Sequence, residues 1–159
     1  MTKEQISSYT MRISQANTAQ LALILYEMII DSIKDATSSH KKGDQEGFER
    51  DLGKAQNYLQ ELISMSRMDS KVAADTVSIY LFVDHELLMS LVKKEPVHLE
   101  ECLGYLESLQ TSFQEIAKTD TDGPLMENTQ QVYAGLTYGK GYLNESMDPM
   151  QNSNRGFQA

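Results

Sequence analysis

The chain has 159 residues, a single cysteine, a formal net charge of −9 and a pI near 4.7. This length suits one domain that buries a sizeable core without a disulfide. The acidic balance argues against nucleic acid and anionic lipid as partners, because both are negatively charged. The longest apolar run, residues 21–26, is far shorter than the ~20 residues that span a bilayer. Together with a polar start that lacks a secretory pattern, this predicts a cytoplasmic protein without membrane insertion.

Residues 1–16 contain isolated apolar side chains in an otherwise polar stretch, namely Ile6, Tyr9, Met11 and Ile13. We therefore expect a loosely ordered N-terminal arm.

Residues 17–36 predict a helix with more apolar surface than one core can use. Asn17 is a good N-cap and Gln20 completes a capping box, so the helix should begin at Thr18. One face has the spacing of a core stripe and consists of Ala22, Leu25, Ile29, Ile33 and Ala36. A second face carries Leu21, Ile24 and Met28, with Leu23, Tyr26 and Ile30 beside it. Large apolar side chains left in water forgo roughly 1.5 to 3 kcal/mol each, so something should cover this face.

Residues 45–65 predict a second helix that follows a tight turn. Gly43 suits a left-handed helix end, and Asp44 suits the N-cap of the next helix. The helix carries a narrow stripe at heptad spacing, made of Phe48, Leu52, Ala55, Leu59 and Leu62. A short polar connection follows, in which Ser70 is the expected cap of the third helix.

Residues 71–94 predict a third helix that is again broadly apolar. One side carries Ala73, Val77, Tyr80, Asp84, Leu87 and Leu91, and the face is widened by Val72, Ile79, Phe82, Val83 and Leu88. A fourth helix is expected from about Pro96, which suits a first turn, to about Lys118. Its stripe consists of Leu99, Cys102, Leu106, Leu109, Phe113 and Ile116.

Four helices of about twenty residues with short connections predict an all-α fold, an antiparallel up-down four-helix bundle. The expected organisation is an N-terminal arm over residues 1–16, the bundle over 17–118 and a tail over 119–159. The tail mixes polar residues, glycines and tyrosines, so we expect it to be poorly ordered. A short fifth helix stays open, because four of its residues have helical spacing: Leu125, Thr129, Val132 and Leu136.

No catalytic or metal-binding motif is evident. Glu95 and His98 form one Glu-x-x-His pair, which in a bundle suggests a di-iron site, but Pro96 interrupts it and no second copy exists. The consecutive acidic and histidine residues 84–86 would point about 100° apart on a helix and so would not converge on one substrate. Cys102 lies on a core stripe. We therefore expect no enzymatic activity, no cofactor and no metal.

The order of these features resembles the FliS family, the export chaperones of flagellin. The matching residues are Tyr9 in the arm, the Leu-x-Leu-x-Leu-Tyr-acidic run of residues 21–27, Lys54-Ala55, Val72-Ala73, and Tyr80 with Phe82. The resemblance covers roughly residues 5–118. The chain departs from the family pattern at Thr18, where proline is usual, and at Glu27-Met28, where Asp-Gly is usual.

The resemblance implies a cytoplasmic chaperone that binds the C-terminal region of flagellin, prevents its premature polymerisation and delivers it to the export gate protein FlhA. It also implies that the arm covers part of the binding surface until flagellin displaces it, which would account for the excess apolar face. The residues expected to bind a partner are Ile6, Tyr9, Met11, Leu23, Tyr26, Met28, Ile30, Ile79 and Phe82. The alternative from the residues alone is a self-associating structural or signalling bundle, whose excess face forms a homodimer interface.

Overall fold

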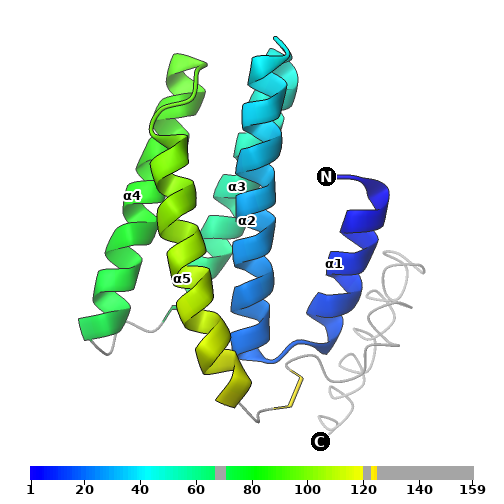
Figure 1. Ribbon diagram of the computed structural model, residues 1–159, viewed down its shortest axis with the longest axis vertical. Coiled ribbons are helices and arrows are strands. Elements are labelled where there is room, and N and C mark those ends of the chain that lie inside the picture. Colours follow the sequence, from blue (N-terminus) through cyan, green and yellow to red (C-terminus); the bar gives the residue numbers. More distant parts are fainter. Residues whose placement is uncertain (67–70, 120–122, 125–159) are drawn as a thin grey trace, which may run out of the picture. The chain divides into compact units, whose positions relative to one another are not determined.

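The structure, a computed structural model, describes residues 1–66, 71–119 and 123–124. Within these residues every regular element is a helix: α1 (Lys3–Gln15), α2 (Thr18–Lys41), α3 (Gln45–Met65), α4 (Lys71–Lys93) and α5 (Leu99–Thr119) (Figure 1). The predicted all-α class is confirmed. The expected cap at Ser70, the fifth helix and the tail lie outside the described residues. None of the described helices combines the length and the apolar character needed to cross a membrane.

Helices α2 to α5 form the bundle. α2 packs against α3 and α5, α3 packs against α4, and α4 packs against α5, so the four helices close around one core. Successive helices alternate in direction, as an up-down order requires (Figure 1). The predicted four-helix bundle is therefore confirmed, and its short connections are the physical reason for the antiparallel order.

The core is built largely from the predicted stripes. The buried residues that pack together are Ala22, Leu25, Tyr26, Ile29, Ile30, Ile33 and Ala36 on α2; Phe48, Leu52, Ala55, Leu59 and Leu62 on α3; Val77, Tyr80, Val83 and Leu87 on α4; and Leu99, Cys102 and Leu106 on α5. Helix α2 contacts α1 as well as α3 and α5, so more of its circumference is covered than that of a surface helix.

Local capping chemistry sets the ends of α2 and α3 as predicted. The Asn17 side chain accepts a hydrogen bond from the Gln20 backbone N–H at 2.9 Å, and the Gln20 side chain accepts one from the Asn17 N–H at 3.0 Å. Gly43 has a φ of 76°, a left-handed conformation that costs glycine least. Asp44 then accepts from the Gly47 N–H at 2.9 Å and caps α3.

The expectation of a loose N-terminal arm was wrong, because residues 3–15 form helix α1. A second capping box starts this helix: Thr2 accepts from the Gln5 N–H at 3.2 Å, and the Gln5 side chain accepts from the Thr2 N–H at 2.7 Å. These bonds satisfy backbone donors that the first helical turn leaves without partners. The arm is therefore an ordered, capped helix.

The fourth bundle helix ends at Thr119, close to the expected Lys118, but it differs from expectation at its start and in the burial of its last turns. α5 begins at Leu99 rather than near Pro96, because Lys94 and His98 adopt left-handed φ values of 58° and 51° that interrupt any continuous helix. Toward the other end Leu109 and Phe113 are only partly buried and Ile116 is exposed. Here α5 diverges from α4 (Figure 1), so this part of the heptad stripe is covered less than the rest, although the Phe113 ring still packs against Tyr26.

Candidate functional site

Helix α1 packs on the side of α2 and covers part of its excess apolar surface. Tyr9 is the one buried residue of α1, with 8% of its surface exposed. It forms a small apolar cluster with Ala16, Ile24 and Met28, which is separate from the bundle core. Ile13 is partly buried against the same cluster. The apolar row of Ile24 and Met28 is therefore covered by a segment outside the bundle.

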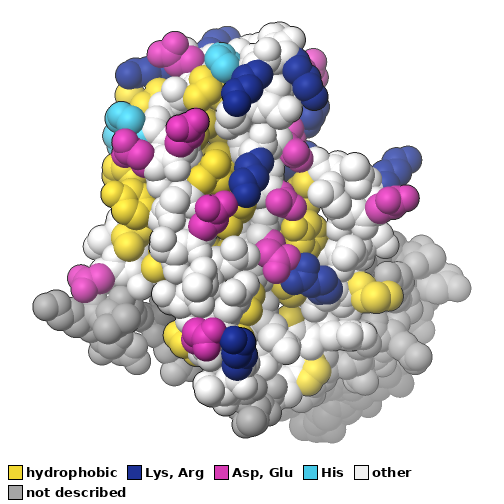
Figure 2. All heavy atoms as spheres, viewed as in Figure 1, with side chains coloured by type: hydrophobic (Ala, Val, Ile, Leu, Met, Phe, Trp, Pro, Cys, Tyr) yellow, Lys and Arg dark blue, Asp and Glu magenta, His cyan; other side chains and the backbone are white. Residues whose placement is uncertain are grey.

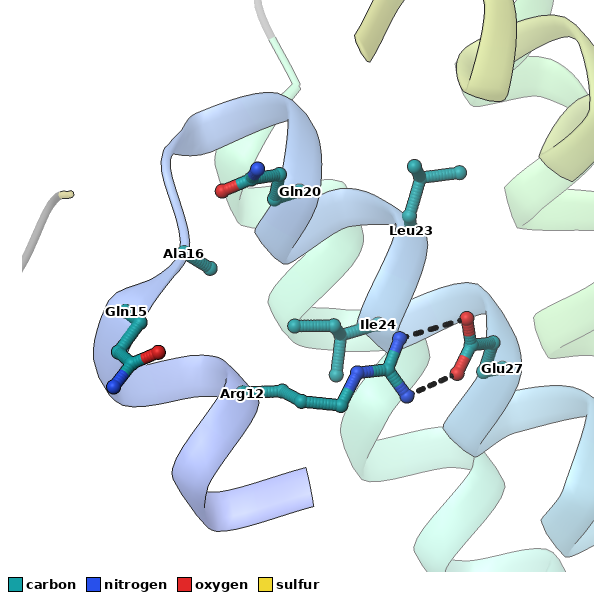
Figure 3. A pocket seen from close by; sticks show the side chains of 7 residues that line it. All are labelled: Arg12, Gln15, Ala16, Gln20, Leu23, Ile24 and Glu27. Carbon is teal, nitrogen blue, oxygen red and sulfur yellow. Dashed lines mark hydrogen bonds and ion pairs between the residues drawn. The ribbon is translucent and has the colours of Figure 1, made fainter. Parts of the chain in front are cut away.

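Acidic residues of α2 hold α1 at this position. The Tyr9 hydroxyl donates a hydrogen bond to Asp31 Oδ2 at 2.8 Å. The Arg12 guanidinium donates two hydrogen bonds to the Glu27 carboxylate, at 2.6 and 2.9 Å (Figure 3). The guanidinium carbon also lies 5.6 Å from the centre of the Tyr9 ring, which is a cation–π geometry. The Arg12 guanidinium, bound to Glu27, therefore also contacts the ring of Tyr9, whose hydroxyl is bound to Asp31.

The environment keeps both donors in their hydrogen-bonding form. Burial, followed by the hydrogen bond to Asp31, raises the pKa of the Tyr9 hydroxyl well above its ordinary value. The hydrogen bonds to Glu27 raise the pKa of the Arg12 guanidinium, against the opposing effect of burial. Neither contact is therefore lost through deprotonation of its donor near neutral pH.

A cavity of about 340 Å³ lies beside these contacts, between α1 and α2 (Figure 3). Its lining residues are Arg12, Gln15, Ala16, Gln20, Leu23, Ile24 and Glu27. Apolar atoms of α2 thus meet charged and amide side chains within one hollow. Helix α1 does not fill the groove along α2, and Leu23 stays only partly buried.

The predicted division of α2 into a core face and a separate exchangeable face was wrong at two residues. Tyr26 is 0% exposed, its hydroxyl is hydrogen-bonded to the Tyr80 hydroxyl, and its ring packs against Phe113. Ile30 also belongs to the bundle core. The reason is that α4 and α5 reach round to positions beside the predicted core stripe of α2. The role of Tyr26 and Ile30 in partner binding stays a prediction.

The structure separates the other predicted partner-binding residues of α1 and α2 into two groups. Tyr9 and Met28 meet in the cluster under α1, and Leu23 lines the cavity beside it. Ile6 and Met11 are exposed, so the arm does not bury them against α2. The α1 contact therefore depends on Tyr9 rather than on all the apolar residues of the arm.

A second apolar surface lies on α4 and α5. Phe82 is partly exposed and meets the ring of Tyr105 edge-on, with the ring centroids 5.8 Å apart and the planes at 89°. Ile79 is partly buried against the core. Figure 2 shows hydrophobic atoms at the surface over α4 and α5. Further exposed apolar side chains on α4 are Leu81, Leu88 and Val92.

The junction of α4 and α5 contains a buried glutamate. Glu86, which is 6% exposed, accepts hydrogen bonds from His85 Nδ1 at 2.9 Å and from His98 Nδ1 at 2.8 Å. The Ser90 hydroxyl donates to the Glu86 carbonyl and accepts from the Val97 N–H at 2.9 Å. In the described part of the chain, no group of three or more His, Cys, Asp or Glu could hold a metal ion. This cluster therefore fixes the turn.

Cys102 is buried in the core, as predicted. Burial, with a smaller effect from the nearby carboxylates of Glu86 and Glu101, raises the pKa of its thiol to about 12. A thiol with this pKa is not a nucleophile near neutral pH.

The architecture of a four-helix bundle with a helical arm on its first helix agrees with the comparison to known families. Residues 1–120 match the family model described as FliS, flagellar protein FliS, which includes all five described helices. The chain belongs to the FliS family. FliS proteins are flagellar export chaperones of flagellin, and the family is one of chaperones rather than of enzymes. A comparison with curated protein sequences finds no match.

Sequence reasoning on this FliS chain missed the polar half of the α1 site and the exposed Tyr105. The signals were present, because Arg12 follows Tyr9 by three residues and Asp31 follows Glu27 by four, which are the spacings of one helix face. They were overlooked because the arm was expected to be loose, and a segment without helical structure has no defined face.

Proposed function

We propose that this protein works in the cytoplasm, binds the C-terminal region of flagellin, keeps it from polymerising before export and delivers it to the export gate protein FlhA. The observation that carries the proposal is helix α1, which covers an apolar row on α2 through contacts that another segment can replace. Family membership supports flagellin as the client.

Helix α1 is held by few contacts compared with the helices of the bundle. It buries one large side chain, Tyr9, and Met1, just before the helix, buries another and pairs its amino group with Asp35 at 2.6 Å; burial of each side chain contributes roughly 1.5 to 3 kcal/mol. The Arg12 and Glu27 side chains are 44% and 32% exposed, and ion pairs of this kind contribute about 0 to 1 kcal/mol. A longer segment that buries several apolar side chains can therefore compete with α1.

A client that displaces α1 would gain the apolar row of Ile24 and Met28 and the neighbouring Leu23. An amphipathic helix with apolar residues at three- and four-residue steps fits such a row. The surface around Phe82 and Ile79 offers a second place, and a client that folds on binding can cover both. Ile6 and Met11, exposed on α1, are proposed contacts of a partner other than the segment that displaces α1. Tyr26 and Ile30 would support the row from within.

Titration calorimetry with a synthetic peptide of the host flagellin C-terminal region tests the proposal. We expect one-to-one binding by the wild-type chain and about tenfold tighter binding by Tyr9→Ala or by deletion of residues 1–13, because the displaced cover is weakened. Ser8→Ala is the matched control: it changes an exposed residue of the same helix and should leave the affinity unchanged.

Two results would count against the proposal. A wild-type chain that does not bind the peptide contradicts flagellin binding through this region. Weaker binding by Tyr9→Ala, with the helical circular dichroism intact, shows that α1 is a contact of the client and not its competitor.

Self-association is a second candidate, favoured by the exposed apolar row of Leu81, Leu88 and Val92 on α4. Size-exclusion chromatography with light scattering distinguishes the two. A monomer that shifts to a one-to-one complex with flagellin supports the chaperone, and a tight dimer that ignores flagellin supports a structural or signalling bundle.

A further inference from the structure

Two parallel rows of side chains on α2 meet α1, and they differ in chemistry. Ile24 and Met28 form the apolar row that Tyr9 covers. Glu27 and Asp31, also four residues apart, form an acidic row beside it. Both acids accept hydrogen bonds from α1, as described above.

The contacts define a direction and a register. Arg12 follows Tyr9 along α1, while its partner Glu27 precedes Asp31 along α2. The two helices therefore run antiparallel here, and donors three residues apart on α1 meet acceptors four residues apart on α2 (Figure 3). The Arg12 guanidinium and the neutral Tyr9 hydroxyl, about one turn apart on α1, thus donate hydrogen bonds to both acids.

Any segment that replaces α1 meets the same two acids. A segment with apolar side chains alone would cover Ile24 and Met28 but would take water from Glu27 and Asp31 without offering them a partner, which is unfavourable. An acidic segment would also be repelled by a chain of net charge −9. The groove therefore favours an occupant that is apolar on one row and basic on the next.

We infer that Glu27 and Asp31 are specificity-determining residues for the client: the segment that displaces α1 is an amphipathic helix, antiparallel to α2, that presents lysine or arginine to Glu27 and a hydrogen-bond donor to Asp31. The inference rests on the proposed function and names the chemistry of the client at that site. Helix α1 is then an internal copy of this chemistry, with Tyr9 and Arg12 in place of the client residues.

The test must separate the acids' contact with α1 from their contact with the client. Tyr9→Phe combined with Arg12→Ala, in the full-length chain, removes the hydrogen bonds of α1 to both acids and serves as the background. Glu27→Gln is then added to this background, and the affinity for the synthetic flagellin C-terminal peptide is measured by calorimetry. Glu61→Gln is the matched control, because it makes the same charge change at an exposed position on α3.

We expect Glu27→Gln to weaken binding about fivefold in the background, and Glu61→Gln to leave it unchanged. A peptide whose lysines and arginines are replaced by glutamine should lose the same factor with the background protein and nothing further with Glu27→Gln added. Equal affinities of the background protein with and without Glu27→Gln would overturn the inference while leaving the proposed function intact. Absence of peptide binding by the wild-type chain would overturn both.

Discussion

The hydroxyl pair of Tyr26 and Tyr80 leads to a prediction in which two single substitutions harm the protein more than their combination. Both side chains are essentially buried, and each hydroxyl is the hydrogen-bond partner of the other. Burial raises the pKa of both hydroxyls above that of an exposed tyrosine, so both stay protonated near neutral pH. Tyr26→Phe leaves the Tyr80 hydroxyl without that partner inside the core, and Tyr80→Phe does the reverse.

An orphaned buried hydroxyl costs about 1 to 3 kcal/mol, whereas replacing both partners by apolar groups of the same shape is nearly neutral. We therefore expect each single variant to lose about 2 kcal/mol of unfolding free energy and the double variant to lose less than ~1 kcal/mol. The coupling energy between the sites is then about 3 kcal/mol, at the upper end for residues in direct contact.

Urea unfolding followed by far-ultraviolet circular dichroism measures these values, since the sequence has no tryptophan for fluorescence. With a urea m-value of about 2 kcal/mol/M, each single substitution should lower the midpoint by roughly 1 M. Tyr105→Phe is the control, because its side chain is half exposed and should change stability by less than ~0.5 kcal/mol. A double variant as unstable as the sum of the singles would refute the reasoning, because the two hydroxyls would then not depend on each other.

Two further predictions concern α3 and the α4–α5 junction. Gly53→Ala should raise the unfolding free energy by roughly 1 kcal/mol, since a Cβ at this position has open space. The unfolding free energy of Gly47→Ala should be about 0.5 to 2 kcal/mol lower than that of Gly53→Ala, because its Cβ would overlap the capping Asp44 carboxylate. Equal urea midpoints of the two variants would contradict this. Hydrogen bonds from His85 and His98 lower the pKa of Glu86. The stability that the Glu86 carboxylate contributes is therefore fully present above the unfolded-state pKa of about 4.3 and is lost as the pH falls below it. The deficit of Glu86→Gln relative to wild type should therefore shrink in urea titrations between pH 5.5 and pH 3, and a deficit independent of pH would argue against the carboxylate as its source.

Local signals predicted the start of α2 and the turn from α2 to α3, because capping depends on residues within one turn of each other. Asn17, Gly43 and Asp44 act as expected for this reason. Tyr26 could not be assigned correctly from spacing, because its burial depends on α4 and α5, which are distant in sequence. Ile116 shows the converse: its position fits the heptad stripe, but its side chain is exposed where α5 diverges from α4 (Figure 1).

The candidate site was only half predictable for a similar reason. Tyr9 and Met28 were expected on the binding surface, and the structure brings them together. The acids that receive Tyr9 and Arg12 lie on another helix, so their pairing depends on a docking register that hydrophobic spacing does not encode. Periodicity identifies which rows of a helix need a partner, and tertiary contacts decide which partner each row receives.

Helix α1 is joined to α2 through Ala16 and Asn17 alone, and both are buried. A segment of 13 residues spans at most about 45 Å even when fully extended, so a displaced α1 stays within this distance of its junction with α2. A tethered competitor of this kind acts at an effective concentration on the order of millimolar, whatever the amount of protein in the cell. Under the proposed exchange of α1 with flagellin, release of the client would reset the chaperone: α1 would reoccupy the groove before a second flagellin at lower concentration could, without nucleotide hydrolysis.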